Sequence, residues 1–203
     1  GRPVGVIANN SNSSSGGAID ADAADKASRF MQLCDAFDIP VLSLIDCPGN
    51  MVGPEAEKEA LIRHCGRMYV AGANLTVPFF AVILRKSYGL GALAMSTGSF
   101  DETFFAISWP TGEFAGMGLE GSIKLGRRSE LAAIEDIPKR KARYEELVAD
   151  AYAWSRALNA GTVFEVDDVI DPATTRDWLI MGLESAPPPE PRAGKKHKWI
   201  DTW

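Results

Sequence analysis

Two closely spaced glycines are the residues whose type and position best fit a chemical role. They follow the apolar run 81–84 and a basic pair, in the order Gly89-Leu90-Gly91-Ala92. A Val/Ile/Leu run that opens into glycines is typical of a buried strand turning tightly into a helix. Glycine lets a ligand approach the main chain, and the amides of a first helical turn carry partial positive charge. The stretch therefore predicts an oxyanion hole, in which N–H donors stabilise negative charge on a carbonyl-type oxygen.

The side chains offer fewer candidates for catalysis. His64 and Cys65 are neighbours in an expected helix, where adjacent residues point roughly 100° apart, so we interpret both as structural. The other histidine, His197, lies near the end of the chain, which argues against a histidine-rich metal site. Asp46 and Glu113 follow or begin turns, where a carboxylate either acts as a general base or binds backbone amides. Two interpretations of the glycine stretch stay open: backbone chemistry, or a turn that needs its glycines for geometry alone.

The composition excludes several classes of partner. The chain of 203 residues has 21 basic and 27 acidic residues and a net charge of -6, so we expect no nucleic-acid partner.

Its cysteines, Cys34, Cys47 and Cys65, match no zinc or thioredoxin spacing, and an odd number argues against a disulfide framework. A reducing, cytoplasmic location is expected. Because no apolar run approaches the ~20 residues that cross a bilayer, we expect no membrane span. The start, without methionine and close to a strand, suggests a piece of a longer polypeptide.

Strand and helix patterns alternate along the chain, which is typical of an α/β fold. The expected strands are residues 4–8, 41–45, 78–84, 104–109 and 163–166. The expected helices are 21–37, capped by Asp20 or Asp22, then 54–73, a short helix within 112–125, and 138–158 and 172–183. On the first helix, Asp25 and Asp35 are expected mostly on the outer face. Residues 1–185 are predicted to form one domain, and the proline-rich residues 186–203 an extended tail.

Longer motifs occur in a fixed order along nearly the whole chain before the tail. They are Gly1-Arg2-Pro3-Val4-Gly5, Asp25-Lys26-Ala27-Ser28-Arg29-Phe30, Leu44-Ile45-Asp46-Cys47-Pro48-Gly49, Ile62-Arg63-His64, Arg85-Lys86-Ser87-Tyr88-Gly89, Trp109-Pro110-Thr111-Gly112-Glu113, Met117-Gly118-Leu119-Glu120-Gly121 and Asp167-Asp168-Val169-Ile170-Asp171-Pro172. Together they resemble the C-terminal half of the carboxyltransferase component of biotin-dependent acyl-CoA carboxylases. This family includes the propionyl-CoA and methylcrotonyl-CoA enzymes.

The resemblance implies a crotonase-like fold, a spiral of ββα units whose strand-to-helix turns present backbone amides. It implies transfer of a carboxyl group from carboxybiotin to the α-carbon of an acyl-CoA, with biotin as cofactor and no metal in this chain. The implied partners are the acyl-CoA, the biotin carboxyl carrier and biotin carboxylase components, the N-terminal carboxyltransferase half, and further copies in a homo-oligomer. Because the active site lies between an N-terminal half and a C-terminal half, this chain alone is expected to be inactive.

The resemblance also implies roles for residues at the glycine turn. The backbone N–H groups of Gly91 and Ala92 are expected to form the oxyanion hole that faces biotin, while the other half holds the acyl-CoA enolate. Substrate is expected beside Gly89, Leu90, Leu93 and Ala94. Leu93 and Ala94 either border an acyl chain or only pack the helix.

Two positions depart from the usual family pattern. Leu90 is inserted into the usual Tyr-Gly-Gly-Ala, so we align the final pair, Gly91-Ala92. Asn50 stands where an aromatic residue commonly follows Pro-Gly, and this change alters the expected pocket wall.

Two alternatives to a carboxyltransferase remain at this point. The first is another crotonase-type acyl-CoA enzyme, a hydratase, hydrolase or decarboxylase. A hydratase or hydrolase would need a carboxylate base such as Glu113 or Asp46. The second is a non-catalytic assembly module that uses the helix after Pro138 as an interface.

Overall fold

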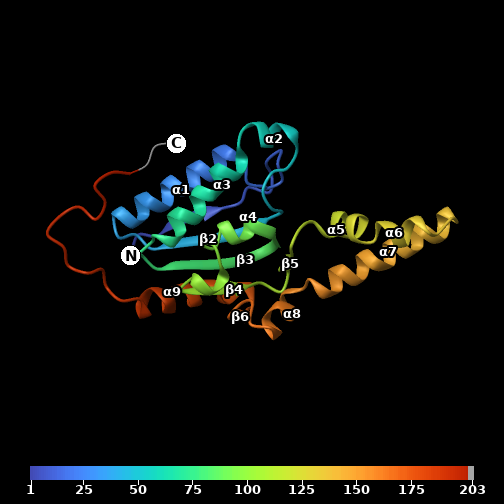
Figure 1. Cartoon of the computed structure of the whole chain (residues 1–203). Coiled ribbons are helices and arrows are strands. Elements are labelled where there is room, and N and C mark those ends of the chain that lie inside the picture. The colour runs from blue at the N-terminus through green and yellow to red at the C-terminus, as the bar shows by residue number, and fades with distance from the viewer. Residues whose placement is uncertain (201–203) are drawn as a thin grey trace.

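The computed structural model describes residues 1–200 and contains a six-stranded sheet with helices on both faces (Figure 1). The strands are β1 Gly5–Ala8, β2 Val41–Cys47, β3 Phe79–Tyr88, β4 Phe105–Ser108, β5 Glu113–Ala115 and β6 Asp168–Val169. Their order is β1-β2-β3-β4-β6, and β5 pairs with the carboxyl end of β3. All of these pairs are parallel. Parallel neighbours need crossover connections, usually helical, so this sheet confirms the predicted α/β class.

Helices cover the two faces of the sheet unequally. They are α1 Ala21–Ala36, α2 Pro54–Lys58, α3 Leu61–Ala73, α4 Gly89–Ala94, α5 Leu119–Gly126, α6 Arg128–Ala132, α7 Ile137–Trp154, α8 Ala157–Thr162 and α9 Thr175–Ser185. The helices α1 and α3 lie on one face and α9 lies on the other (Figure 1). The larger core, which includes Met31, Met68 and Ile83, fills the first interface. A smaller core around Phe80 and Phe105 packs against Trp178 of α9.

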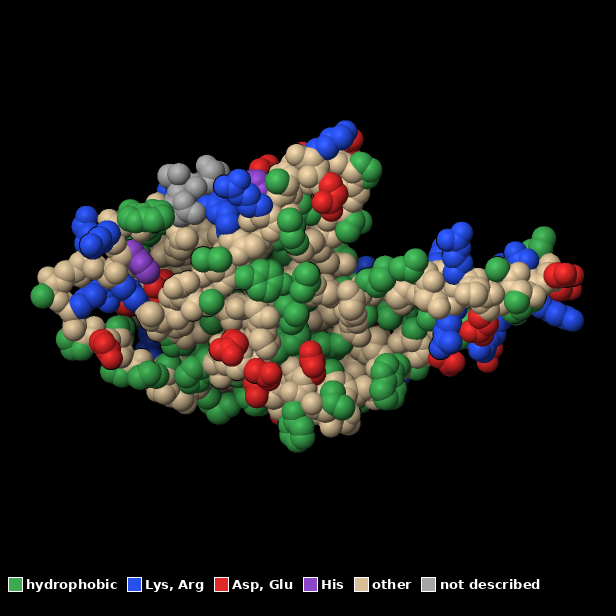
Figure 2. Space-filling model, viewed as in Figure 1, with side chains coloured by type: hydrophobic (Ala, Val, Ile, Leu, Met, Phe, Trp, Pro, Cys, Tyr) green, Lys and Arg blue, Asp and Glu red, His purple; other side chains and the backbone are tan. Residues whose placement is uncertain are grey.

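The segment from α5 to α7 projects from the sheet as an arm (Figure 1). Its helices hold one another through polar contacts: the Tyr152 hydroxyl donates to Glu120 Oε1 at 2.6 Å, and Lys124 lies over the ring of Tyr144. Apolar side chains stay exposed along the arm and at its base, as the space-filling view shows (Figure 2). Trp154 is 79% exposed and Phe164 is 86% exposed.

Several predicted boundaries were wrong, each for a local reason. The strand through residues 81–84 does not stop at the basic pair but continues as β3 to Tyr88, because β5 pairs with residues 86–88. The helix expected over 54–73 is two helices, α2 and α3, divided at Ala60, whose φ of 55° is left-handed. The strand expected at 163–166 does not form; the strand is β6, at Asp168–Val169, beside β4.

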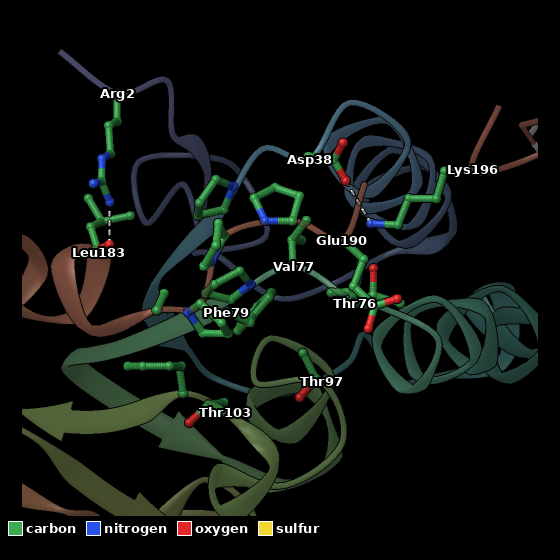
Figure 3. Close-up of a pocket in the computed structure, with 18 of the residues that line it drawn as sticks. Arg2, Asp38, Thr76, Val77, Phe79, Thr97, Thr103, Leu183, Glu190 and Lys196 are labelled. Atoms are coloured by element: carbon green, nitrogen blue, oxygen red, sulfur yellow. Dashed lines mark hydrogen bonds and ion pairs between the residues drawn. The ribbon is translucent and has the colours of Figure 1, made fainter. Parts of the chain in front are cut away.

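The tail, residues 186–200, contains neither helix nor strand in the structure. It runs alongside the body and borders a cavity of about 1390 Å³, whose lining includes Phe79 and Leu183 (Figure 3). Figure 3 shows Lys196 reaching Asp38, with Nζ 3.2 Å from Oδ1. The predicted division between residues 1–185 and 186–203 stays a prediction, and residues 201–203 lie outside the described residues.

Asp25 and Asp35 are buried, which contradicts the outward placement that helical periodicity predicted. Asp25 accepts hydrogen bonds from His64 Nδ1, at 2.9 Å, and from Arg67. Asp35 is 1% exposed, and its carboxylate accepts from the backbone N–H groups of Thr76 and Val77 at 2.8 and 3.2 Å. Both carboxylates therefore hold α1 against neighbouring segments and do not face solvent.

The tail also converges on Asp35. Lys196 Nζ lies 2.9 Å from Oδ1, and His197 Nε2 lies 2.6 Å from Oδ2. Although burial raises the pKa of Asp35, its hydrogen bonds with Thr76, Lys196 and His197 hold that pKa below the ordinary value. A carboxyl with a lowered folded-state pKa stabilises the protein above its unfolded-state pKa. That contribution is lost as the pH falls through the folded-state pKa.

We expect Asp35→Ala to lower the free energy of unfolding by about 3–5 kcal/mol at pH 7, because buried donors lose their acceptor. Asp22→Ala is the matched control: Asp22 lies exposed in the first turn of the same helix, where a carboxylate contributes about 0.3–1 kcal/mol. Denaturant unfolding of both variants at pH 7 and pH 4 measures the two costs. The cost of Asp35→Ala should be smaller at pH 4, because the contribution of the carboxylate declines as the pH falls. A cost for Asp35→Ala no larger than that of the control would contradict the assigned role.

Candidate active site at the glycine turn

The helix α4 begins directly at the carboxyl end of β3, where Tyr88 is its N-cap. The turn is possible because Gly89 has a φ of 57°, a left-handed conformation that favours glycine. A Cβ at this position would also lie 2.6 Å from the carbonyl oxygen of Gly116. The predicted strand-to-helix turn is therefore confirmed, and Gly89 is required by its geometry.

Gly91 is needed for a different reason. Its Cα lies against the loop after β2, so that a Cβ would lie 2.6 Å from the carbonyl carbon of Gly49 and 2.9 Å from the nitrogen of Asn50. These approaches are shorter than real Cβ contacts and involve backbone atoms, which cannot move aside cheaply. The position of α4 is therefore fixed against the Asp46-Cys47-Pro48-Gly49 turn, another motif of the sequence.

The first turn of α4 offers a backbone donor to a ligand, because the N–H of Gly91 precedes that of Ala92, the first N–H that reaches back four residues to the carbonyl of the N-cap Tyr88. Within the described chain, no turn or cap hydrogen bond uses the N–H of Gly91 or Ala92 as its donor. An N–H in a first helical turn lies at the positive end of the helix dipole and attracts negative charge. The start of α4 thus presents a partly positive backbone donor, the kind of group that an oxyanion hole uses.

A cavity of about 470 Å³ lies beside this turn. Four of the six residues predicted around the site line it: Gly89, Leu90, Ala92 and Leu93. Gly91 instead faces the Gly49 loop, and Ala94 is fully buried. The sequence did not identify the rest of the lining, which is Ser87, Phe100, Phe114, Ala115, Gly116 and Glu165. Strand pairing brings Phe114 and Ala115 of β5 beside the end of β3. No local sequence pattern predicts such long-range contacts.

The two carboxylates considered as bases are held by neighbouring donors. Asp46 accepts from Arg85 Nε at 3.1 Å and Nη2 at 3.0 Å, and from the backbone N–H of Lys86. Although burial raises the pKa of Asp46, the hydrogen bonds from Arg85 and Lys86 hold it below the ordinary value. Glu113 accepts from the hydroxyl of the buried Tyr88 at 2.7 Å. These contacts favour a structural role for both carboxylates.

Other candidate sites find no support among residues 1–200. No group of three or more His, Cys, Asp or Glu side chains in that range is placed to hold a metal ion. The three cysteines are free and buried, and burial raises the pKa of Cys65 to about 11 and that of Cys47 to about 11. Thiolates with such pKa values are scarce at neutral pH, so neither thiol is suited to nucleophilic attack.

No helix among residues 1–200 is both long and apolar enough to cross a bilayer.

The family follows from the match of residues 1–198 to the carboxyl transferase domain. The chain belongs to this family, and its fold is crotonase-like, as the resemblance implied. A curated relative, the biotin-dependent acetyl-/propionyl-coenzyme A carboxylase beta6 subunit of Mycobacterium tuberculosis, is 36% identical over 191 residues. That alignment covers 92% of this chain and 39% of the relative.

Two solved structures extend the comparison. A single-chain, multi-domain long-chain acyl-CoA carboxylase is 53% identical, with a TM-score of 0.78, over 88% of this chain and 17% of that one. A hexameric transcarboxylase 12S, solved with methylmalonyl-coenzyme A and methylmalonic acid bound, is 36% identical, with a TM-score of 0.83. It covers 98% of this chain and 38% of that one. The chain thus spans well under half the length of each of these relatives.

Proposed function

We propose that this chain is the biotin-side half of an acyl-CoA carboxyltransferase, which moves a carboxyl group from carboxybiotin to the α-carbon of an acyl-CoA. The observation that carries the proposal is the first turn of α4, which has a backbone donor at Gly91, borders a cavity with Gly89, Leu90 and Ala92, and packs against the loop after β2. The family and its biotin-dependent relative support the same assignment.

The residues of the turn fit a bound ureido group. The N–H of Gly91 would donate to its oxygen, and that of Ala92 would do so through a hydrogen bond shared with the Tyr88 carbonyl, so that both stabilise the negative charge that develops there. Gly89 and Leu90 would border the ring, and Leu93 and Ala94 would support the helix on its apolar side. When bound, biotin supplies the carboxyl group; the chain contributes fixed donors that need no reorganisation during the reaction.

The partners follow from the same proposal. The acyl-CoA would be held by an N-terminal carboxyltransferase half, and biotin would arrive on a carrier component charged by a biotin carboxylase. A homo-oligomer is expected, because the exposed apolar side chains of the arm need cover and because the transcarboxylase 12S is a hexamer. The proposed location is the cytoplasm.

A hydratase or hydrolase that used Asp46 or Glu113 as its base fits the site less well. Such an enzyme needs a free carboxylate beside the acyl carbonyl. Asp46 is held by Arg85 and Glu113 is held by Tyr88. Neither Asp46 nor Glu113 lines the cavity at the glycine turn; the carboxylate in its lining is that of the exposed Glu165. A decarboxylase, which would use the same hole for the same oxyanion, remains the second candidate.

Binding of biocytin, the lysine conjugate of biotin, tests the proposal against an assembly module. We expect weak, saturable binding, with a Kd on the order of 1 mM, because only one side of the site is present. Chemical-shift changes in an NMR titration should be confined to residues 87–93 and the Gly49 loop. A titration without saturable shifts there, on a chain whose circular dichroism shows it folded, would favour the assembly module.

A further inference from the structure

Tyr69 on α3 makes a contact that connects it to the glycine turn. Its hydroxyl donates a hydrogen bond of 2.5 Å to the carbonyl oxygen of Leu90. Its ring lies against Gly98, where a Cβ would be 3.3 Å from Tyr69 Cδ1. Tyr69 therefore contacts both the first turn of α4 and the chain just beyond that helix. Burial raises the pKa of Tyr69, so the hydroxyl keeps its proton and remains a donor at neutral pH.

The hydrogen bond acts on one particular peptide unit. The carbonyl of Leu90 and the N–H of Gly91 belong to the same planar group and point in opposite directions. A donor bound to the carbonyl fixes the plane and thus the direction of the N–H. It also polarises the amide, because linked hydrogen bonds strengthen one another.

The side chain of Leu90 gives this peptide little other support. It is 57% exposed at the cavity, in contrast to the fully buried Ala94 on the same helix. Its other contacts come from the backbone: the Leu90 carbonyl is in position to accept from the N–H of Ala94 within α4, and Gly91 packs against the Gly49 loop. The Tyr69 hydroxyl thus adds a side-chain hydrogen bond to a peptide that backbone contacts also hold.

We infer that Tyr69 is a positioning residue for carboxyl transfer: its hydroxyl orients and polarises the Leu90–Gly91 peptide so that the Gly91 N–H meets the oxyanion. The inference rests on the proposed function, because it assigns a purpose to the same N–H. Tyr69 itself does not contact substrate. Its contribution passes through the peptide, so removing the hydroxyl should weaken the donor without removing it.

The test is Tyr69→Phe in the complete carboxyltransferase, with both halves present. The ring and its packing on Gly98 are retained. We expect kcat to fall about fivefold, the usual effect of losing one neutral hydrogen bond, while the KM for the acyl-CoA stays unchanged. Amide hydrogen exchange at Gly91 should become several-fold faster. Tyr152→Phe is the matched control, since it deletes a hydroxyl bound to Glu120 on the arm.

Two comparisons make the outcome decisive. If kcat of Tyr69→Phe equals that of the Tyr152→Phe control while Gly91→Ala is inactive, the hole is correct and the inference about Tyr69 is wrong. If Gly91→Ala also keeps its activity, the proposed donor itself has failed. A fall in kcat accompanied by an equal rise in KM for the acyl-CoA would indicate general disorder of the site and would also overturn the inference.

Discussion

Replacing Gly91 with alanine is expected to lower kcat about a hundredfold to a thousandfold in the complete carboxyltransferase. The added Cβ would lie 2.6 Å from the carbonyl carbon of Gly49, so either α4 or the loop after β2 must move. The atoms that the Cβ meets belong to the backbone, so a shift of α4 also displaces the Gly91 N–H. An oxyanion hole depends on donors held within a few tenths of an ångström of the developing charge, which is why a single methyl has so large an effect.

Gly66→Ala is the control for this substitution. Gly66 lies inside α3, where an added Cβ meets nothing within 4 Å, so the variant should keep its turnover and gain up to about 1 kcal/mol of stability. A thermal melt and circular dichroism must accompany both assays, because Gly91→Ala is also expected to cost about 1–3 kcal/mol. A folded Gly91→Ala enzyme with near-normal turnover would place the hole elsewhere, and Gly89 would be the next candidate.

The sequence predicted those features of the site that arise from neighbouring residues. An apolar run followed by glycines is enough to predict β3, the turn and the start of α4, because strand, turn and cap are all local. The left-handed Gly89 is the clearest case. The reason for the second glycine was not accessible, since Gly91 meets a loop that follows a different strand. Only the packing of α4 on that loop shows that Gly91 has no room for a side chain.

Long-range contacts also explain why the predictions for Asp35 and for the end of β3 were wrong. Asp35 has the spacing of a surface residue on α1, yet its partners include Lys196, which lies 161 residues further along the chain. The extension of β3 to Tyr88 depends on β5, which is too short to show any periodicity of its own. Helical and strand periods describe one element at a time, whereas these features depend on which elements become neighbours.

Supplying the N-terminal carboxyltransferase half is expected to change activity from none to measurable. Alone, this chain should show no appreciable carboxylation of propionyl-CoA, because the proposed acyl-CoA hole lies in the other half and both reactants must be held together. The exposed Trp154 and Phe164 offer apolar surface for such an assembly. The assay follows transfer from a carboxylated biotin carrier to propionyl-CoA, with and without the second half. The Gly91→Ala chain, mixed with the same half, should restore almost nothing. A purified chain that carboxylates propionyl-CoA unaided would show that both oxyanion holes lie within these 203 residues.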